Sequence, residues 1–282
     1  MTKNKINDLI PLAVNGDSQA LEMIVTDIQD FVFNISLRML GMVADAQDAS
    51  QDILIKIITN LSSFRNEANF TTWVYRIAIN YLYDYKKSMF AQHPLDFDFY
   101  ANDIRAGYID NTDELLLGIS AEEMAEELKL SCTNVMLQCL DSQSRCIFIL
   151  GTMFKVDSRI ASEILDISPE NYRQKLSRSR KKMAAFLSEN CGLCGGTCQC
   201  QRRVGYAIQQ YRINPQNRAF HQLKQLDEEL IKDYKETMEL FEEKMNLFEE
   251  LPVYHSPIDV KQFIVHLVSS KDMDKMKEYS GT

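Results

Sequence analysis

The sequence predicts an all-α protein, and two observations support this prediction. Apolar residues recur at intervals of three and four, the period of one helical face, in runs such as 5–40 and 45–64. Turn signals separate successive runs, as at Asn15-Gly16-Asp17. With 282 residues, the chain is long enough for about two domains.

The charge of the chain is unevenly distributed. The formal net charge is −9, but residues 131–224 carry +8 between acidic segments at 88–130 (−8) and 225–282 (−7). Exposed charges are screened beyond about 8–10 Å at physiological salt, so the local sign matters more than the total. The basic segment is therefore a candidate site for a polyanion.

No apolar run approaches the ~20 residues of a membrane span, and the N-terminus lacks a secretory apolar segment, so we expect a cytoplasmic protein.

Residues 159–187 have the pattern of a helix-turn-helix. An apolar stripe in 159–165 is interrupted at 166–169, and a second stripe follows. Ser168 can cap the second helix. Pro169 suits its first position, where a missing N–H costs nothing, and Glu170 favours the positive end of the helix dipole.

The face of this second helix opposite its apolar stripe is polar and basic. Residues 171–182 contain six basic side chains and no acidic one. Such a face suits the DNA major groove, where cations meet phosphates and Arg or Gln side chains reach base edges. The alternative is an ordinary solvated face. The candidate DNA-reading residues are Arg173, Gln174, Ser177, Arg178 and Lys181.

Two earlier segments are also candidate binding surfaces. The predicted helix 45–64 places polar and acidic side chains away from its apolar face, which fits either a protein-docking surface or an ordinary amphipathic helix. Residues 64–87 mix seven aromatic side chains with basic ones, the composition of a surface that stacks unpaired bases. Some of these aromatics are spaced like core residues, so we expect only a few, chiefly in the loop 65–71, to be free for bases.

These motifs resemble a known family. DAQDASQDI and FRNEANFTTWVYRIAIN, within 45–87, resemble region 2 of bacterial sigma-70-type RNA polymerase sigma factors of the compact extracytoplasmic-function (ECF) group. Residues 140–183 resemble region 4 of the same factors. The resemblance covers about 1–187 and implies two small helical domains joined by an acidic linker. It gives the division 1–90 (region 2), 91–128 (linker), 129–188 (region 4) and 189–282 (a Cys-containing, helical C-terminal extension).

The resemblance also implies roles. Region 4 would read the −35 promoter element in duplex form with the candidate residues already named. Region 2 would dock on core RNA polymerase and would capture and melt the −10 element by holding a flipped base, which must repay an unstacking cost of a few kcal/mol. The implied polymerase-binding residues are Asp45, Asp48, Gln51 and Asp52. The implied −10 residues are Phe64, Arg65, Asn66, Phe70, Trp73, Arg76 and Asn80.

The acidic segment from residue 88 to about 128 reads as irregular. It fits a solvated tether between two DNA-binding modules. The resemblance implies in addition that it threads a polymerase channel, where negative charge would mimic nucleic acid.

Seven cysteines form two groups. Cys132, Cys139 and Cys146 are spaced by seven, which suits small buried thiols on helices. The other four lie within CGLCGGTCQC, where zinc or another soft metal, a redox-responsive thiol set and a glycine-rich turn remain open alternatives. They are Cys191, Cys194, Cys198 and Cys200. No cofactor is required by the rest of the chain.

The C-terminal extension contains two further candidate functional features, a set of arginines and a helical stripe. Arginines that follow the Cys cluster are candidate phosphate contacts: Arg202, Arg203, Arg212 and Arg218. A helical stripe from Leu230 to Phe248 fits either a helix packed on its own protein or an acidic regulatory helix that covers region 2 or 4.

Three function classes compete. The leading one is a sigma factor that binds core RNA polymerase and promoter DNA, with an anti-sigma factor as a further candidate partner and no membrane partner. The second is a stand-alone helix-turn-helix regulator, responsive to metal or redox state. An enzyme is disfavoured because we find no Gly-rich phosphate loop, no HExxH motif and no nucleophile–base arrangement among four histidines.

Overall fold

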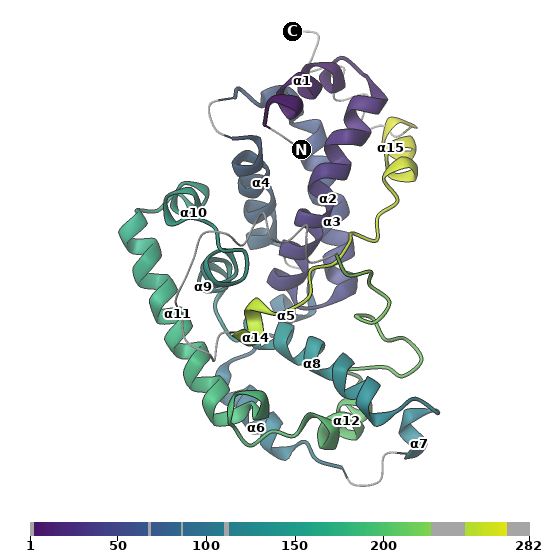
Figure 1. Ribbon diagram of the computed structural model, residues 1–282, viewed down its shortest axis with the longest axis vertical. Coiled ribbons are helices and arrows are strands. Elements are labelled where there is room, and N and C mark those ends of the chain that lie inside the picture. Colours follow the sequence, from purple (N-terminus) through teal and green to yellow (C-terminus); the bar gives the residue numbers. More distant parts are fainter. Residues whose placement is uncertain (1–2, 67–68, 86, 110–112, 227–245, 270–282) are drawn as a thin grey trace.

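Helices make up almost all the regular structure of the protein in a computed structural model (Figure 1). The structure describes residues 3–66, 69–85, 87–109, 113–226 and 246–269. Across these residues the β-structure amounts to an isolated antiparallel bridge between Gln225 and Tyr254. The predicted all-α class is confirmed. In the same part of the chain, no helix is long and apolar enough to cross a membrane.

The first helices follow the predicted breaks. Asp17 caps the second helix by accepting hydrogen bonds from the N–H groups of Gln19 and Ala20, and Gly41 ends that helix at a φ of 81°, in the left-handed region that favours glycine. The elements are α1 (Lys3–Val14), α2 (Ser18–Leu40), α3 (Val43–Thr59), the 3₁₀ turn η1 (Leu61–Ser63) and α4 (Phe70–Asp84).

The segment expected to be irregular is instead largely helical. It contains α5 (Met89–Gln92), α6 (Phe97–Ala106), α7 (Asp113–Leu116) and the start of α8 (Ala121–Gln138). Several of its acids act in this local structure. Asp96 caps α6, and Ser120 with Glu123 forms a capping box at the start of α8. The rings of Phe97 and Tyr100 pack on Phe186, so this segment lies against the second helix of the predicted helix-turn-helix.

The predicted helix-turn-helix is present. Asp157 caps α10 (Ser158–Leu165), Asp166 turns the chain at a φ of 51°, and Ser168 caps α11 (Pro169–Asn190) with Pro169 at its first position. Before it lie α9 (Ser142–Phe148) and the π-helical segment η2 (Ile149–Met153).

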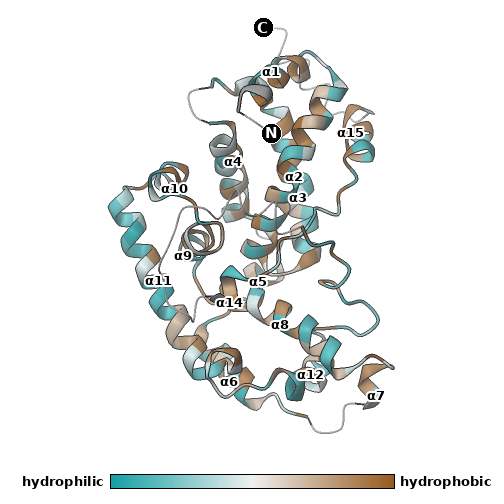
Figure 2. Cartoon of the chain, viewed as in Figure 1, coloured by the Kyte–Doolittle hydropathy of each residue, from teal (hydrophilic) through white to brown (hydrophobic). Residues whose placement is uncertain are grey.

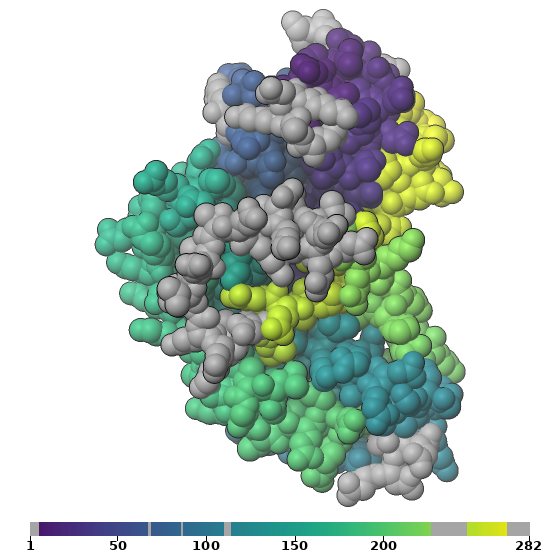
Figure 3. Space-filling model, viewed as in Figure 1, coloured from purple at the N-terminus to yellow at the C-terminus, as the bar shows by residue number. Residues whose placement is uncertain are grey.

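The C-terminal extension returns across the molecule. After η3 (Gly192–Cys194), α12 (Cys200–Gln209) packs on α8, and later residues cross to region 2, where α15 (Val260–Ser269) packs on α2. Figure 3 shows this segment, in yellow, lying across the middle of the molecule. The backbone of Tyr254 exchanges two hydrogen bonds with the Asn34 side chain, at 2.7 and 3.0 Å. The predicted stripe 230–248 lies outside the described residues as far as 245, and α14 (Asn246–Glu249) follows it.

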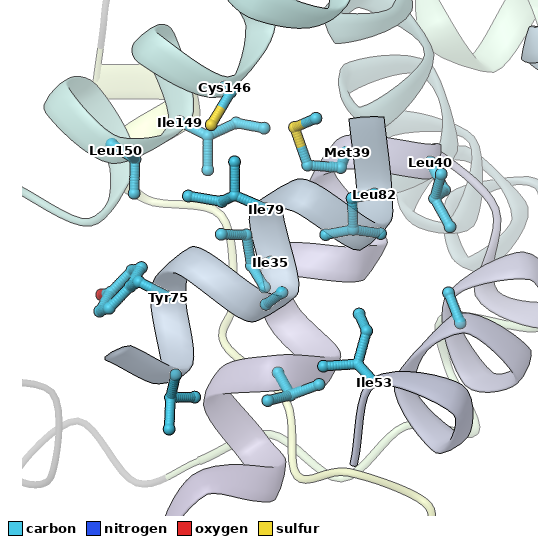
Figure 4. Close-up of a cluster of buried hydrophobic side chains, with 14 of the residues drawn as sticks. Ile35, Met39, Leu40, Ile53, Tyr75, Ile79, Leu82, Cys146, Ile149 and Leu150 are labelled. Atoms are coloured by element: carbon cyan, nitrogen blue, oxygen red, sulfur yellow. The ribbon is translucent and has the colours of Figure 1, made fainter. Parts of the chain in front are cut away.

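The N-terminal helices α1 to α4 and the helix-turn-helix share one hydrophobic core. A single cluster of buried apolar side chains runs from α1 through α4 to α11. Figure 4 shows Ile79 and Leu82 of α4 facing Ile149, Cys146 and Met39, so side chains of both regions meet there. Tyr75 of α4 packs on Phe31, at 4.0 Å between ring centroids, and Phe31 packs in turn on Phe154. The two regions are therefore held together by burial of apolar surface in this conformation.

Candidate nucleic-acid interface

The outer face of α11 carries the predicted duplex-reading residues. Tyr172, Leu176 and Met183 are buried toward the rest of the protein, as the apolar stripe predicted. The five candidates, Arg173, Gln174, Ser177, Arg178 and Lys181, are all exposed. In Figure 2 the ribbon of this part of α11 is coloured mostly hydrophilic and lies at the edge of the molecule. We call these five residues the α11 face.

Two neighbouring basic residues position α11. The guanidinium of Arg180 donates to the Thr152 hydroxyl at 3.0 Å and to the Gly151 carbonyl at 2.9 Å, and the Lys175 ammonium donates to the Gln143 side chain. Arg173, Arg178 and Lys181, in contrast, form no ion pair within the described part of the chain. The basic residues of this helix thus divide into two that hold it and others that remain available to phosphates and bases.

The predicted base-capturing segment is largely packed on itself. The rings of Phe64, Phe70 and Trp73 form a triad with centroid separations of 5.4, 5.5 and 5.7 Å. Phe70 is only 3% exposed, so in this conformation it supports the other two rings. Phe64 and Trp73 are half-buried against the core. We call Phe64, Phe70 and Trp73 the aromatic triad.

The polar −10 candidates differ in their surroundings. Arg65, Asn66 and Asn80 are exposed, and Asn66 adopts a φ of 58° in the loop before α4. Arg76 is engaged with region 4. Its guanidinium donates to the Glu163 backbone carbonyl at 3.0 and 3.3 Å and to the Glu163 carboxylate at 3.2 Å. One predicted −10 residue is therefore held by the helix-turn-helix.

Only part of the acidic face of α3 is exposed and without hydrogen bonds to the rest of the protein. Asp48 and Gln51 are exposed. Asp45 accepts a hydrogen bond from the backbone N–H of Met89 at 3.3 Å, and Asp52 accepts one from the Tyr81 hydroxyl. Burial raises the pKa of Tyr81 above its usual range, and the bond to Asp52 raises it further, so Tyr81 remains the proton donor. A docking partner would meet Asp48 and Gln51 first.

The Cys cluster does not form a recognisable metal centre. Cys191 is buried, Cys194 is half-buried, and across the described residues no three His, Cys, Asp or Glu side chains are grouped to hold an ion. Cys198 and Cys200 do interact. The hydrogen bond from Cys198 lowers the pKa of the Cys200 thiol to about 6. A thiolate is both the reactive form of cysteine and its metal-binding form, so a redox-responsive thiol set and metal binding both stay predictions. Of the earlier three cysteines, Cys146 is buried and the other two are partly exposed.

The arginines after the Cys cluster were mostly misassigned from the sequence. Arg203 and Arg212 both pair with Asp103 of the linker, and Arg218 pairs with Glu123 at 3.3 Å. Only Arg202 keeps an exposed side chain. Burial would raise the pKa of Asp103, but hydrogen bonds from Arg212 and Tyr206 and the charges of both arginines leave it lowered. No local sequence pattern marks this cluster, because Asp103 and its arginine partners lie 100 and 109 residues apart.

Comparison with known proteins shows which family the chain is similar to. Residues 24–89 match the family model described as Sigma-70 region 2. The chain is 27% identical over 175 residues to the ECF RNA polymerase sigma factor SigW of Bacillus subtilis (strain 168), across 62% of this chain and 92% of SigW. It is 26% identical over 181 residues to the ECF RNA polymerase sigma-E factor of Escherichia coli (strain K12), across 61% and 89%. A solved structure of CnrH in complex with the cytosolic domain of CnrY aligns with a TM-score of 0.47 and 20% identity, over 65% of this chain and 97% of that one.

An exposed basic helix beside an aromatic helical segment is a pattern that DNA-binding proteins use. Residues 24–89 thus match a Sigma-70 region 2 domain, and over about 60% of its length the chain is similar to sigma-70-type RNA polymerase sigma factors of the ECF group. These matches favour a sigma factor over a stand-alone helix-turn-helix regulator.

Proposed function

We propose that this sigma factor reads promoters with two separate surfaces while bound to core RNA polymerase. The α11 face contacts the −35 element in duplex form. The aromatic triad with Arg65, Asn66, Arg76 and Asn80 captures and melts the −10 element. The observation that supports this most directly is the α11 face, because exposed cations without internal partners are what phosphate and base-edge contacts require.

Core polymerase binding is proposed for the exposed part of the α3 face. Asp48 and Gln51 can meet a partner without first losing an internal hydrogen bond, whereas Asp45 and Asp52 already have one. A double substitution, Asp48→Lys with Gln51→Lys, should therefore weaken binding to the polymerase. The matched control is Asp84→Asn, which changes an exposed acid at the end of α4.

The promoter itself can be found in the same experiment. Fragmented genomic DNA from the source organism is transcribed with core polymerase plus the chain, and the transcript starts are mapped. We expect new starts that share two upstream sequence elements and disappear with the α3 double substitution. Starts no more frequent than with core polymerase alone would contradict the proposal.

Promoter engagement is proposed to separate α4 from α10. Arg76 is bonded to Glu163 and the aromatic triad is packed on itself, so base capture needs these groups released. Linked binding to polymerase and to the −35 element supplies free energy for that separation.

Two finer predictions remain for the linker and for partners. Asp98 and Glu114 are exposed and are free to face a polymerase channel, whereas Asp103 is occupied by arginines. Asp98→Asn with Glu114→Gln should alter initiation without changing polymerase binding, and unchanged initiation would remove the channel role. An anti-sigma partner also stays a prediction, to be checked by co-purification.

A further inference from the structure

Residues 248–256 of the C-terminal extension contact α9 at one end and α2 at the other, and we call them the strap. In Figure 1 the chain runs from α14, in the middle of the molecule, to α15 beside α2. At the first end the Phe248 ring is buried edge-on against Phe148 of α9, at 5.2 Å between ring centroids. Glu249 pairs with Lys155, just beyond η2, at 2.6 Å. Because α9 packs on α11, this end of the strap is fixed to the helix-turn-helix.

The second end of the strap is held on α2 through its backbone. Asp30, Asn34 and Arg38 are spaced by four residues and so lie on one face of α2. All three form hydrogen bonds with backbone groups of residues 252–256, at distances of 2.5–3.0 Å. Asn34 is 2% exposed and Arg38 is 1% exposed, and the loss of a partner is costly for a buried polar side chain. This end of the strap is therefore fixed to the N-terminal helices.

The connection between the two ends is short. Four residue steps separate Phe248 from Pro252, and a chain of that length reaches at most about 14 Å when fully extended. While both ends stay bound, α9 and α2 cannot move apart by more than this reach. The aromatic triad follows α2, because α4 packs on it, and the α11 face follows α9.

This reach is much smaller than the distance between the two promoter elements. Elements at −35 and −10 are about 25 base pairs apart, or roughly 85 Å of duplex at about 3.4 Å per base pair. In the structure α4 contacts α10, and α11 follows α10 directly. With 22 residues α11 is about 33 Å long, so the α11 face lies within roughly that distance of α4. A further movement of about 14 Å still leaves the two surfaces too close together to meet both elements.

We propose that the strap holds α4 on the helix-turn-helix and thereby limits initiation until binding of polymerase and promoter releases it. The inference rests on the proposed reading of two promoter elements by two surfaces. It makes residues 248–256 an inhibitory segment that the chain itself carries. The apolar core shared by α4, α9 and η2 favours the same closed conformation, in which α4 contacts α10 (Figure 4). The strap adds a covalent limit on separation that those contacts lack.

The first test measures conformation without promoter DNA. Nitroxide labels are attached to p-acetylphenylalanine at Thr26 of α2 and Glu170 of α11, both exposed, so that the native cysteines stay unmodified. Double electron–electron resonance then reports the distance between the labels in the full chain. Phe248→Ala should lower the closed-to-open ratio by about tenfold or more, because it removes a buried ring from α9. Val265→Ala shortens an apolar side chain of α15 that is 66% exposed, and this matched control should leave the ratio unchanged.

A second variant keeps every side chain of the strap. A flexible Gly/Ser insertion of about 12 residues between Glu250 and Leu251 lengthens the connection and leaves both contact sites intact. It should shift the label distance in the same direction as Phe248→Ala, and circular dichroism checks that each chain folds. A closed population that is unchanged in both variants would overturn the proposal, because the shared core alone would then hold the two parts together.

Initiation in reconstituted transcription gives the second readout. The rate should rise in Phe248→Ala and in the insertion variant, by at most the factor by which the open population rises. Open molecules that initiate no faster would overturn the inhibitory role of the strap and would contradict the proposed need for α4 to leave α10. Failure of both variants to open, in contrast, removes the strap and leaves the proposed reading of the promoter intact.

Discussion

The two surfaces predicted to read the promoter differ in their exposure to solvent and in the contacts they make within the protein. The α11 face is exposed throughout and makes no ion pair within the described residues. The −10 segment has Phe70 buried, Arg76 bonded to Glu163 and its aromatic rings stacked on one another. A surface that reads duplex DNA can bind without a conformational change, because the base edges are already accessible in the groove. A base-capturing surface needs room for a flipped base, and this conformation leaves little.

The difference suggests an order of events. The α11 face can engage duplex DNA in the closed conformation, whereas capture of a base at the −10 element must wait until α4 leaves α10. Since α4 packs on η2 and α9 through buried apolar side chains, release costs free energy that polymerase and DNA binding must supply. Variants that change one surface at a time test whether the two surfaces act separately.

The largest effect is expected from removal of both arginines of the α11 face. Arg173→Ala with Arg178→Ala should weaken equilibrium binding of the polymerase complex to promoter DNA by about 100-fold, because each good base contact contributes about 1–3 kcal/mol. Fluorescence anisotropy of labelled promoter DNA measures this. Lys182→Ala, an exposed basic neighbour outside the α11 face, is the control and should cost less than threefold.

Loss of the Trp73 ring should act on melting. Stacking of a base on an aromatic side chain contributes about 1–3 kcal/mol, so Trp73→Ala should reduce open complexes by about tenfold while binding to duplex changes little. Permanganate reactivity of unpaired thymines measures the open fraction. Trp73→Phe keeps a ring and should recover most of the signal. A fall in duplex binding as large as the fall in melting would contradict a separate melting role.

Weakening the Arg76–Glu163 contact should have a modest and opposite effect. The two side chains are 42% and 51% exposed, and exposed ion pairs contribute about 0–1 kcal/mol. Glu163→Gln should therefore raise the initiation rate by no more than about fivefold. The matched control is Glu189→Gln at the exposed end of α11. A decrease in initiation would mean that the contact belongs to the active conformation.

The smallest expected change is in salt dependence. Lys181→Ala should reduce the slope of log affinity against log salt by about one, because one phosphate contact and its released counterion are lost. Its effect should be similar on every promoter. A change restricted to one promoter sequence would instead make Lys181 a base reader.

The parts of this fold that depend on nearby residues were predictable. The cap at Ser168, Pro169 after it and the basic face of α11 follow from a dozen consecutive positions, and the structure confirms the helix there. The match of 45–87 to a family motif likewise placed Asp48 and Trp73 on helices.

Contacts between distant residues were not predictable. The linker was expected to be irregular because its acids read as solvation, yet Asp103 is the shared partner of Arg203 and Arg212. Nothing local in the sequence marks Arg76 as the partner of Glu163, 87 positions away. Such pairings depend on how packed helices meet, and a periodic pattern specifies only which face is buried.

We propose that the α11 face and the aromatic triad read separate elements of the promoter. Its most direct test is the ratio of initiation rates on templates with an intact and a scrambled upstream element, measured in reconstituted transcription. The ratio is compared for the wild-type chain, the Arg173→Ala/Arg178→Ala chain and the Trp73→Ala chain. We predict that it falls close to one in the double arginine variant and stays at the wild-type value in Trp73→Ala. A ratio that survives the loss of both arginines, or that collapses equally in both variants, would contradict the division.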